Sequence, residues 1–144
     1  MQRIIKFRGK RVDNGEWVYG YYTEDVQWDV DDNSRIEVHY IRQLSKDGEF
    51  YEEFEVDPKT VGQFTGLISK NGKRIYEGDI VNIPLFGNSI IIWNKSISAF
   101  QYAYHAIGKG TSIGGRMTNT LYSDEQPKYE VIGNIHEDGG LLEK

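Results

Sequence analysis

Three histidines, a glycine-rich loop and several carboxylates are the residues whose types could support catalysis. His39, His105 and His136 are far apart in the sequence, so their spacing does not predict a metal site. The chain has no cysteine, which excludes disulfides and thiolate chemistry. No nucleophile motif accompanies these residues. We therefore expect no catalytic residues, no metal and no cofactor. An enzyme would need a cleft that brings together distant residues, such as His105 with an acid.

Two segments come close to ligand-binding motifs. The loop Gly108-Lys109-Gly110-Thr111 resembles a phosphate-binding loop, but Gly110 stands where the magnesium-binding hydroxyl is required. The acidic segment 29–33 begins like a calcium loop, but Ser34 and Tyr40 stand where that loop needs glycine and glutamate. We interpret the acidic segment as a solvated turn, with a weak incidental cation site as the alternative.

Charge is segregated along the chain. Residues 1–12 carry a net charge of +5, residues 13–57 carry −11, residues 58–128 carry +4 and the last sixteen carry −3. Such a distribution indicates an oriented surface field, unless neighbouring strands pair the basic and acidic stretches and cancel it.

The basic N-terminal stretch is the candidate nucleic-acid surface. In a strand, Lys6, Arg8 and Lys10 would line one face and could contact a phosphate backbone. The interpretations that we favour are an edge strand protected by cations, or a strand paired with the acidic region. The full candidate set adds neighbouring cations and two near a predicted turn: Arg3, Lys6, Arg8, Lys10, Arg11, Lys73 and Arg74.

Turn signals and alternation predict antiparallel β-structure. Glycine next to Asn or Asp suits short hairpin turns, because such turns need a positive φ. Four such pairs separate strand-like segments: Asn14-Gly15, Asp47-Gly48, Asn71-Gly72 and Gly87-Asn88. Trp17, Tyr19 and Tyr21 alternate on one face of a strand. We expect that row in the core, with a platform for stacking bases as the alternative.

Little helix is expected. Short turns are predicted near residues 57–60 and after Ile135. The glycine-rich segment 107–127 is predicted to be a long loop interrupted by a strand at about 117–122. A further strand over 129–135 and a polar tail complete the chain.

Four blocks of the sequence resemble the YopX family of phage and prophage proteins. They are IKFRGK (5–10), WVYGYY (17–22), TVGQFTGLISKNGKRIYEGDIV (60–81) and EVIGNIHE (130–137). The resemblance implies a β-rich fold built on a small SH3-like barrel, and it supplies no catalytic or binding residues. The family's usual proline after the last block is absent here, which argues against an ordered C-terminal helix.

Together these observations predict one mainly β YopX-like domain over 1–144. An N-terminal hairpin layer (1–57) would lie against an SH3-like barrel part (58–137), followed by a tail (138–144). We expect a non-enzymatic phage accessory protein that binds a host or phage macromolecule. A protein partner is favoured and nucleic acid is the alternative. We expect no signal peptide, because the first residues are charged and include no apolar core, and the apolar runs of the sequence are shorter than a membrane helix needs. We expect a cytoplasmic protein of the bacterial host, and exposed strand edges allow a homo-oligomer.

Overall fold

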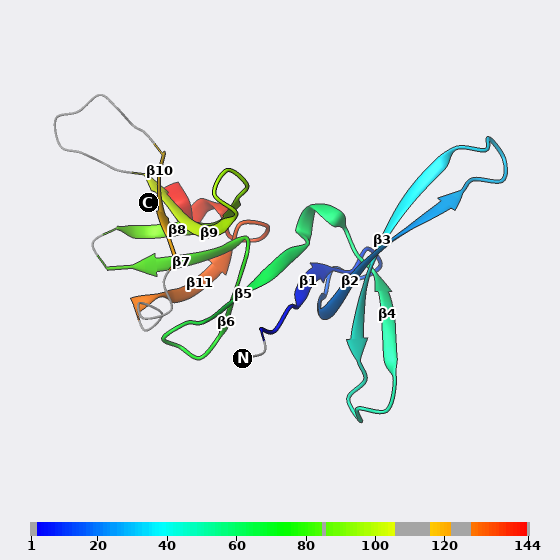
Figure 1. Cartoon of the computed structure of the whole chain (residues 1–144), viewed down its shortest axis with the longest axis horizontal. Helices are drawn as coiled ribbons and strands as arrows, with labels where there is room; N and C mark the ends of the chain where they lie inside the picture. The colour runs from blue at the N-terminus through cyan, green and yellow to red at the C-terminus, as the bar shows by residue number, and fades with distance from the viewer. Residues whose placement is uncertain (1–2, 85, 106–115, 122–127, 144) are drawn as a thin grey trace. The chain divides into compact units, whose positions relative to one another are not determined.

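The computed structural model describes residues 3–84, 86–105, 116–121 and 128–143. Over these residues the protein is built of two antiparallel sheets with little helix, which confirms the prediction of a mainly β protein (Figure 1). The chain divides into two compact units, Met1–Gln63 and Phe64–Lys144. The predicted division at residue 57 lies inside the first unit.

The first unit is a run of antiparallel strands joined by short turns. Its elements are β1 (Phe7–Lys10), β2 (Trp17–Trp28), β3 (Arg35–Leu44), β4 (Tyr51–Glu55), the 3₁₀ helix η1 (Pro58–Thr60) and the start of β5 (Gly62–Ile68). Gly15 and Gly48 have φ of 73° and 76°, as the predicted turns require. Asp57 accepts a hydrogen bond from the Lys59 amide at the start of η1, where a short turn is predicted.

Strand β1 lies inside its sheet, in which β4, β3, β2, β1 and β5 follow one another. It pairs with β2 on one side and with Gly62 and Gln63 of β5 on the other. The interpretation of the basic stretch as an edge strand is therefore wrong. Beyond β1 the chain also bridges to Val56, and the Asp57 amide donates to the Lys10 carbonyl at 2.9 Å.

A small core holds the first unit together. Val18, Ile41 and Val56 are buried, with exposed fractions of 4%, 0% and 1%. Phe7, Tyr22, Phe54 and Val61 pack against them. Burying a side chain of this size contributes about 1.5–3 kcal/mol relative to leaving it exposed. The inward row on β2 therefore consists of even-numbered residues.

The acidic segment between β2 and β3 forms a turn stabilised by its own side chains. The Asp29 carboxylate accepts hydrogen bonds from the amides of Asp31 and Asp32, at 2.8 and 3.3 Å. Asn33 takes the left-handed conformation with φ of 58°. The predicted solvated acidic turn is confirmed.

The second unit contains the rest of β5 and most of the remaining strands. Its elements are β6 (Arg74–Tyr76), β7 (Asp79–Ile83), β8 (Gly87–Asn94), β9 (Ala99–His105), β10 (Arg116–Thr120), β11 (Glu130–Asn134) and the 3₁₀ helix η3 (Gly139–Glu143). The five-stranded sheet has the order β10-β9-β8-β7-β11. Within the described strands no pairing joins β10 to β11, so the sheet is open and the expected closed barrel is not formed.

The core of the second unit is larger and gathers from several strands. Its buried members are Ile75, Val81, Ile83, Ile91, Tyr102, Tyr129 and Val131. The buried Asp79 carboxylate accepts the Tyr76 amide at 2.7 Å, which fixes the turn between β6 and β7. This bond satisfies a polar group that would otherwise be costly to bury.

Several boundaries differ from those predicted. Gly72 forms the predicted turn with φ of 81°. Gly87, with φ of 74°, instead opens β8, because β7 already ends at Ile83. The predicted strands near 117–122 and 129–135 are present as β10 and β11, while much of the 107–127 loop lies outside the described residues. The predicted tail is partly wrong: η3 is ordered, and the Asn88 side chain donates to the Leu141 carbonyl.

Candidate functional site

Three exposed tyrosines lie on one face of the sheet formed by β2, β3 and β4. Tyr21 pairs directly with Arg42, and Leu44 pairs with Tyr51. Residues opposite one another in antiparallel strands share a face, and Tyr19 joins them because it is two residues from Tyr21. The tyrosine side chains are 44–49% exposed. We call Tyr19, Tyr21, Arg42, Leu44 and Tyr51 the aromatic patch.

The prediction that Tyr19 and Tyr21 belong to the core is wrong. The inward positions of β2 are taken by Val18, Gly20 and Tyr22 instead. A Cβ on Gly20 would come within 1.9 Å of the Arg42 carbonyl oxygen, so only glycine fits this approach between β2 and β3. Because Gly20 has no side chain, the inward residues of β2 look less apolar in the sequence than the outward row of Trp17, Tyr19 and Tyr21.

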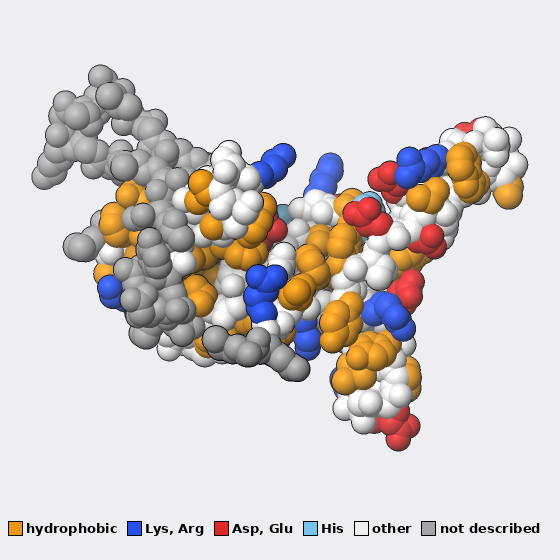
Figure 2. Space-filling view, viewed as in Figure 1, with side chains coloured by type: hydrophobic (Ala, Val, Ile, Leu, Met, Phe, Trp, Pro, Cys, Tyr) orange, Lys and Arg blue, Asp and Glu red, His pale blue; other side chains and the backbone are white. Residues whose placement is uncertain are grey.

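Contacts within the patch hold its side chains against one another. The rings of Tyr21 and Tyr51 have centroids 6.1 Å apart. The Arg42 guanidinium lies 5.4 Å from the centre of the Tyr51 ring, an arrangement that contributes about 0.5–1 kcal/mol at an exposed site. In Figure 2, hydrophobic side chains lie beside basic and acidic ones on the β3–β4 hairpin. Large aromatics and arginine are the residues most enriched at binding hot spots.

The patch lies in a strongly acidic segment. Residues 17–57 contain three Lys or Arg against twelve Asp or Glu, a net charge of −9. Ten of these acids are exposed, and only Asp29 and Asp57 are partly covered. Arg35 forms an ion pair with Glu37 at 3.4 Å. The exposed side chains of this segment therefore give it a negative surface charge.

Other exposed apolar residues near the tip of the β2–β3 hairpin do not form a comparable face. Val26 and Trp28 share a face with Glu37 and Arg35, whereas Ile36 pairs with Gln27 on the opposite face. They are divided between two sides of a two-stranded ribbon. The aromatic patch is the more continuous apolar surface of the two.

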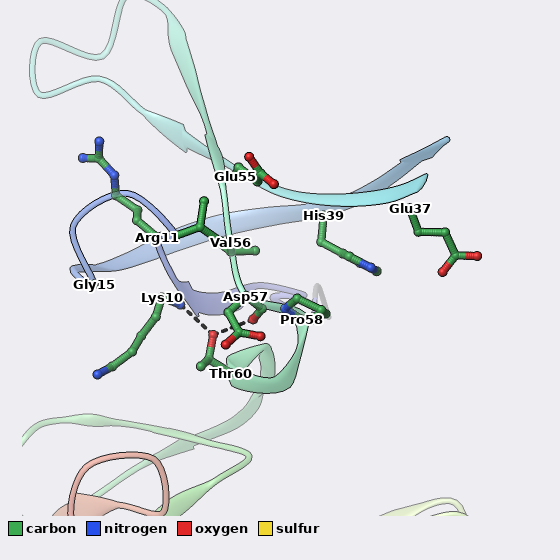
Figure 3. A pocket seen from close by; sticks show the side chains of 11 residues that line it. Lys10, Arg11, Gly15, Glu37, His39, Glu55, Val56, Asp57, Pro58 and Thr60 are labelled. Carbon is green, nitrogen blue, oxygen red and sulfur yellow. Dashed lines mark hydrogen bonds between the residues drawn. The ribbon is translucent and has the colours of Figure 1, made fainter. Parts of the chain in front are cut away.

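A pocket of about 710 Å³ opens in the first unit, beside the bridge between Arg11 and Val56 (Figure 3). Figure 3 shows the side chains of Lys10, Arg11 and Glu55 pointing in different directions. The Thr60 hydroxyl already donates to the Asp57 carbonyl at 2.6 Å and accepts from the Lys10 amide at 2.8 Å. The polar groups are held by the fold and do not converge on one point.

A hydrogen-bonded chain lies on the inward face of β2 and β3. The Tyr22 hydroxyl donates to Glu24 at 2.9 Å and lies 2.5 Å from Nδ1 of His39. Burial, followed by the interaction with Glu24, raises the pKa of Tyr22 to about 12.

The described part of the chain shows neither a metal-ligand cluster nor a membrane-spanning helix. No three or more His, Asp or Glu side chains gather there in a way that could hold a metal ion. None of the helices among those residues has the length and apolar character to cross a membrane.

The sequence pattern of the YopX protein family matches residues 6–143. The chain belongs to the YopX family. No curated protein matches it. Among solved structures it is similar to the crystal structure of protein EF1440 from Enterococcus faecalis. The two are 26% identical, with a TM-score of 0.42, and the match covers 98% of this chain and 99% of the other.

Two of the predicted nucleic-acid residues, Arg8 and Lys10, lie against Trp17 and do not form an exposed basic row. Arg8 is 6% exposed, and its guanidinium carbon lies 4.7 Å from the Trp17 ring centre. Lys10 lies 5.5 Å from the same ring, and Lys6 is partly covered. A phosphate backbone could not reach Arg8 in this conformation.

The other predicted nucleic-acid residues are scattered. Arg11 pairs with Asp13 at 2.6 Å, and that hydrogen bond lowers the pKa of Asp13. Arg3, Lys73 and Arg74 are exposed, and Arg74 lies 5.1 Å from the Phe64 ring centre. In this YopX-family protein the basic N-terminal segment is therefore built largely into the fold of the first unit.

Sequence reasoning did not identify Arg42, Leu44 and Tyr51 as site residues. Tyr51 alternates with Phe54 and Val56, which are turned inward, so its outward direction could be predicted. The proximity of Tyr51 to Tyr21 depends on the pairing of β2, β3 and β4, and no short sequence motif specifies that pairing.

Proposed function

We propose that this YopX-family protein is a non-enzymatic binding module whose first unit docks on a positively charged surface of a partner protein. The observation that carries the proposal is the aromatic patch, which is exposed and set in an acidic segment. Aromatic anchors supply apolar contact, while the surrounding carboxylates select a basic partner and speed its approach. We place this activity in the bacterial cytoplasm, as a phage accessory function.

A non-enzymatic role is supported by the pocket. Its side chains diverge (Figure 3), and the one imidazole that lines it is held by Tyr22 through Nδ1. A general acid or base needs a partner group within hydrogen-bond reach of a common reacting atom. The pocket offers no such convergence among the described side chains.

Nucleic acid receives less support as the partner. Of the cations that would contact phosphate, Arg8 and Lys10 lie against Trp17 and Arg11 is paired with Asp13, while residues 17–57 carry a net charge of −9. Labelled DNA and RNA titrated at about 50 and 200 mM salt test this alternative, because phosphate contacts weaken over that range. Salt-sensitive binding would replace the protein-partner proposal.

The direct experiment is affinity capture from bacterial lysate on the immobilised protein and on a Tyr21→Ser variant. Tyr21 is exposed, so we expect the variant to fold with stability within about 0.5 kcal/mol of the parent. The proposal predicts a basic protein captured by the parent, released by salt and lost from the variant. The same proteins captured equally by both would contradict it.

A further inference from the structure

The outer edge of β4 is open to an additional strand. β4 ends the six-stranded sheet, with β3 as its neighbour on one side. The Ser45 amide donates to the Phe50 carbonyl, and the Val56 amide donates to the His39 carbonyl, both at 2.8 Å. Antiparallel pairing alternates along a strand, so the even-numbered residues of β4 bond to β3. The N–H and C=O groups of Tyr51 and Glu53 therefore point outward.

The open stretch is short and well defined. In the described part of the chain, the outward N–H and C=O groups of Tyr51 and Glu53 form no backbone hydrogen bond. It ends at Glu55, whose carbonyl accepts the Val12 amide at 3.1 Å. Open edges of this kind are templates for pairing with another chain.

The charges beside the outer edge of β4 favour a basic strand over a second copy of β4. Residues 42–55 contain Arg42 and Lys46 against five acids, a net charge of −3. Glu52 and Glu53 are exposed on opposite faces of β4. Two copies of β4 placed side by side would bring like charges together, which is destabilising. A strand with basic side chains would instead pair carboxylates with cations.

We propose that the outer edge of β4 binds an extended, positively charged segment of the partner protein as an added antiparallel or parallel strand. The inference rests on the proposed function and specifies how the partner is held. The outward groups of Tyr51 and Glu53 supply main-chain hydrogen bonds. Glu52, Glu53 and Glu55 attract cations, and Tyr51 extends the contact onto the aromatic patch.

A short capped peptide of alternating lysine and threonine is the first probe. Binding is followed by calorimetry, and amide hydrogen exchange is followed by NMR. We expect binding that slows exchange at Tyr51 and Glu53 by about tenfold or more when the peptide is saturating. Amides of Glu52 and Phe54 already bond to β3 and serve as internal controls. Absence of peptide binding, or unchanged exchange at Tyr51 and Glu53, would overturn the proposal.

Backbone methylation of the peptide separates strand addition from simple charge attraction. Two further peptides carry N-methyl groups on alternate residues. One is methylated at the odd-numbered residues and the other at the even-numbered residues. In an added strand only one set of amides faces β4, so one version should lose about tenfold or more in affinity and the other should retain it. Equal affinity of all three peptides would overturn strand addition. Because the same protein is used with all three peptides, a difference in affinity cannot come from misfolding of a protein variant.

Protein variants give a matched second test. Glu53→Ala removes a carboxylate, whereas Glu53→Pro also removes an outward N–H that β3 does not use, a position where an edge strand tolerates proline. We expect Glu53→Pro to weaken peptide binding well beyond Glu53→Ala, with both folded by circular dichroism. Equal weakening would contradict the added strand.

The two proposals fail differently. If a captured protein depends on Tyr21 but the peptide results are negative, strand addition is wrong and the proposed function stands. If the peptide adds to β4 but no captured protein depends on Tyr21, the patch is not the docking surface and the proposed function falls.

Discussion

The guanidinium of Arg42 lies 5.4 Å above the ring of Tyr51, although these residues are on different strands. Arg42 is directly opposite Tyr21 in the β2–β3 pairing, so it connects the two tyrosines across the sheet. The arrangement depends on the close approach of β2 and β3 at Gly20. The stability of this part of the first unit and the arrangement of the aromatic patch therefore both depend on the close approach of β2 and β3.

Replacement of Gly20 by alanine should disrupt this approach. The added Cβ would lie 1.9 Å from the Arg42 carbonyl oxygen, which is a backbone atom of a paired strand. We expect destabilisation of about 3 kcal/mol or more, the upper range of overpacking. Gly140→Ala is the control, because nothing lies within 4 Å of its Cβ position. Denaturant unfolding followed by tryptophan fluorescence measures both; equal stability of the two variants would refute the expectation.

Tyr22 should ionise later than an ordinary tyrosine. Its pKa is raised from 10.0 to about 12, first by burial and then by its bond to Glu24. The unfolded chain loses this proton at lower pH than the folded protein, so stability should fall as pH rises from 10 to 12. Spectrophotometric titration of the parent against Tyr22→Phe isolates the transition. If the difference between the two titration curves has its midpoint near pH 10, the environment of Tyr22 is wrongly described.

The side chain of Asn88 should hold the C-terminal 3₁₀ helix. Its Nδ2 donates to the Leu141 carbonyl at 2.8 Å, and its Oδ1 accepts from Asn82 at 2.9 Å. Asn88→Ala should cost about 1 kcal/mol and speed amide exchange over 139–143. Asn82→Ala leaves the bond to Leu141 in place and should leave that exchange unchanged. Similar exchange in both variants would mean that the contact does not hold η3.

Binding of a captured basic partner should weaken with salt. Residues 17–57 carry a net charge of −9, with ten exposed acids, and screening reduces the attraction between exposed charges. We expect the association rate to fall more than the dissociation rate rises when salt is increased, because long-range attraction acts on encounter. Surface plasmon resonance at several salt concentrations separates the two rates. An association rate independent of salt would exclude the acidic surface as the attracting field.

The β-rich fold could be predicted largely because its turns are marked locally. Gly15, Gly48 and Gly72 all take the positive φ that the turn signals imply. Local signals were misleading at Gly87, where the turn forms earlier, and at Tyr19 and Tyr21. There an inward glycine made the outward aromatic row resemble a core face.

The candidate site could be predicted only in part, because its members meet through strand pairing. Alternation places Tyr51 outward, but its contact with Tyr21 and Arg42 requires three strands in one register. Burial of Arg8 likewise depends on Trp17 from the neighbouring strand. Charge counting located the acidic segment but could not show that the same segment carries an exposed aromatic patch.

The most direct test of the binding surface compares the affinity of a captured partner for Tyr51→Ser and Trp28→Ser. Both side chains are exposed, at 48% and 62%, but only Tyr51 belongs to the aromatic patch. We predict that Tyr51→Ser raises the Kd by about tenfold or more, a hot-spot loss, while Trp28→Ser leaves it unchanged. An unchanged Kd for Tyr51→Ser, or an equal loss for Trp28→Ser, would contradict the assignment of the patch as the docking surface.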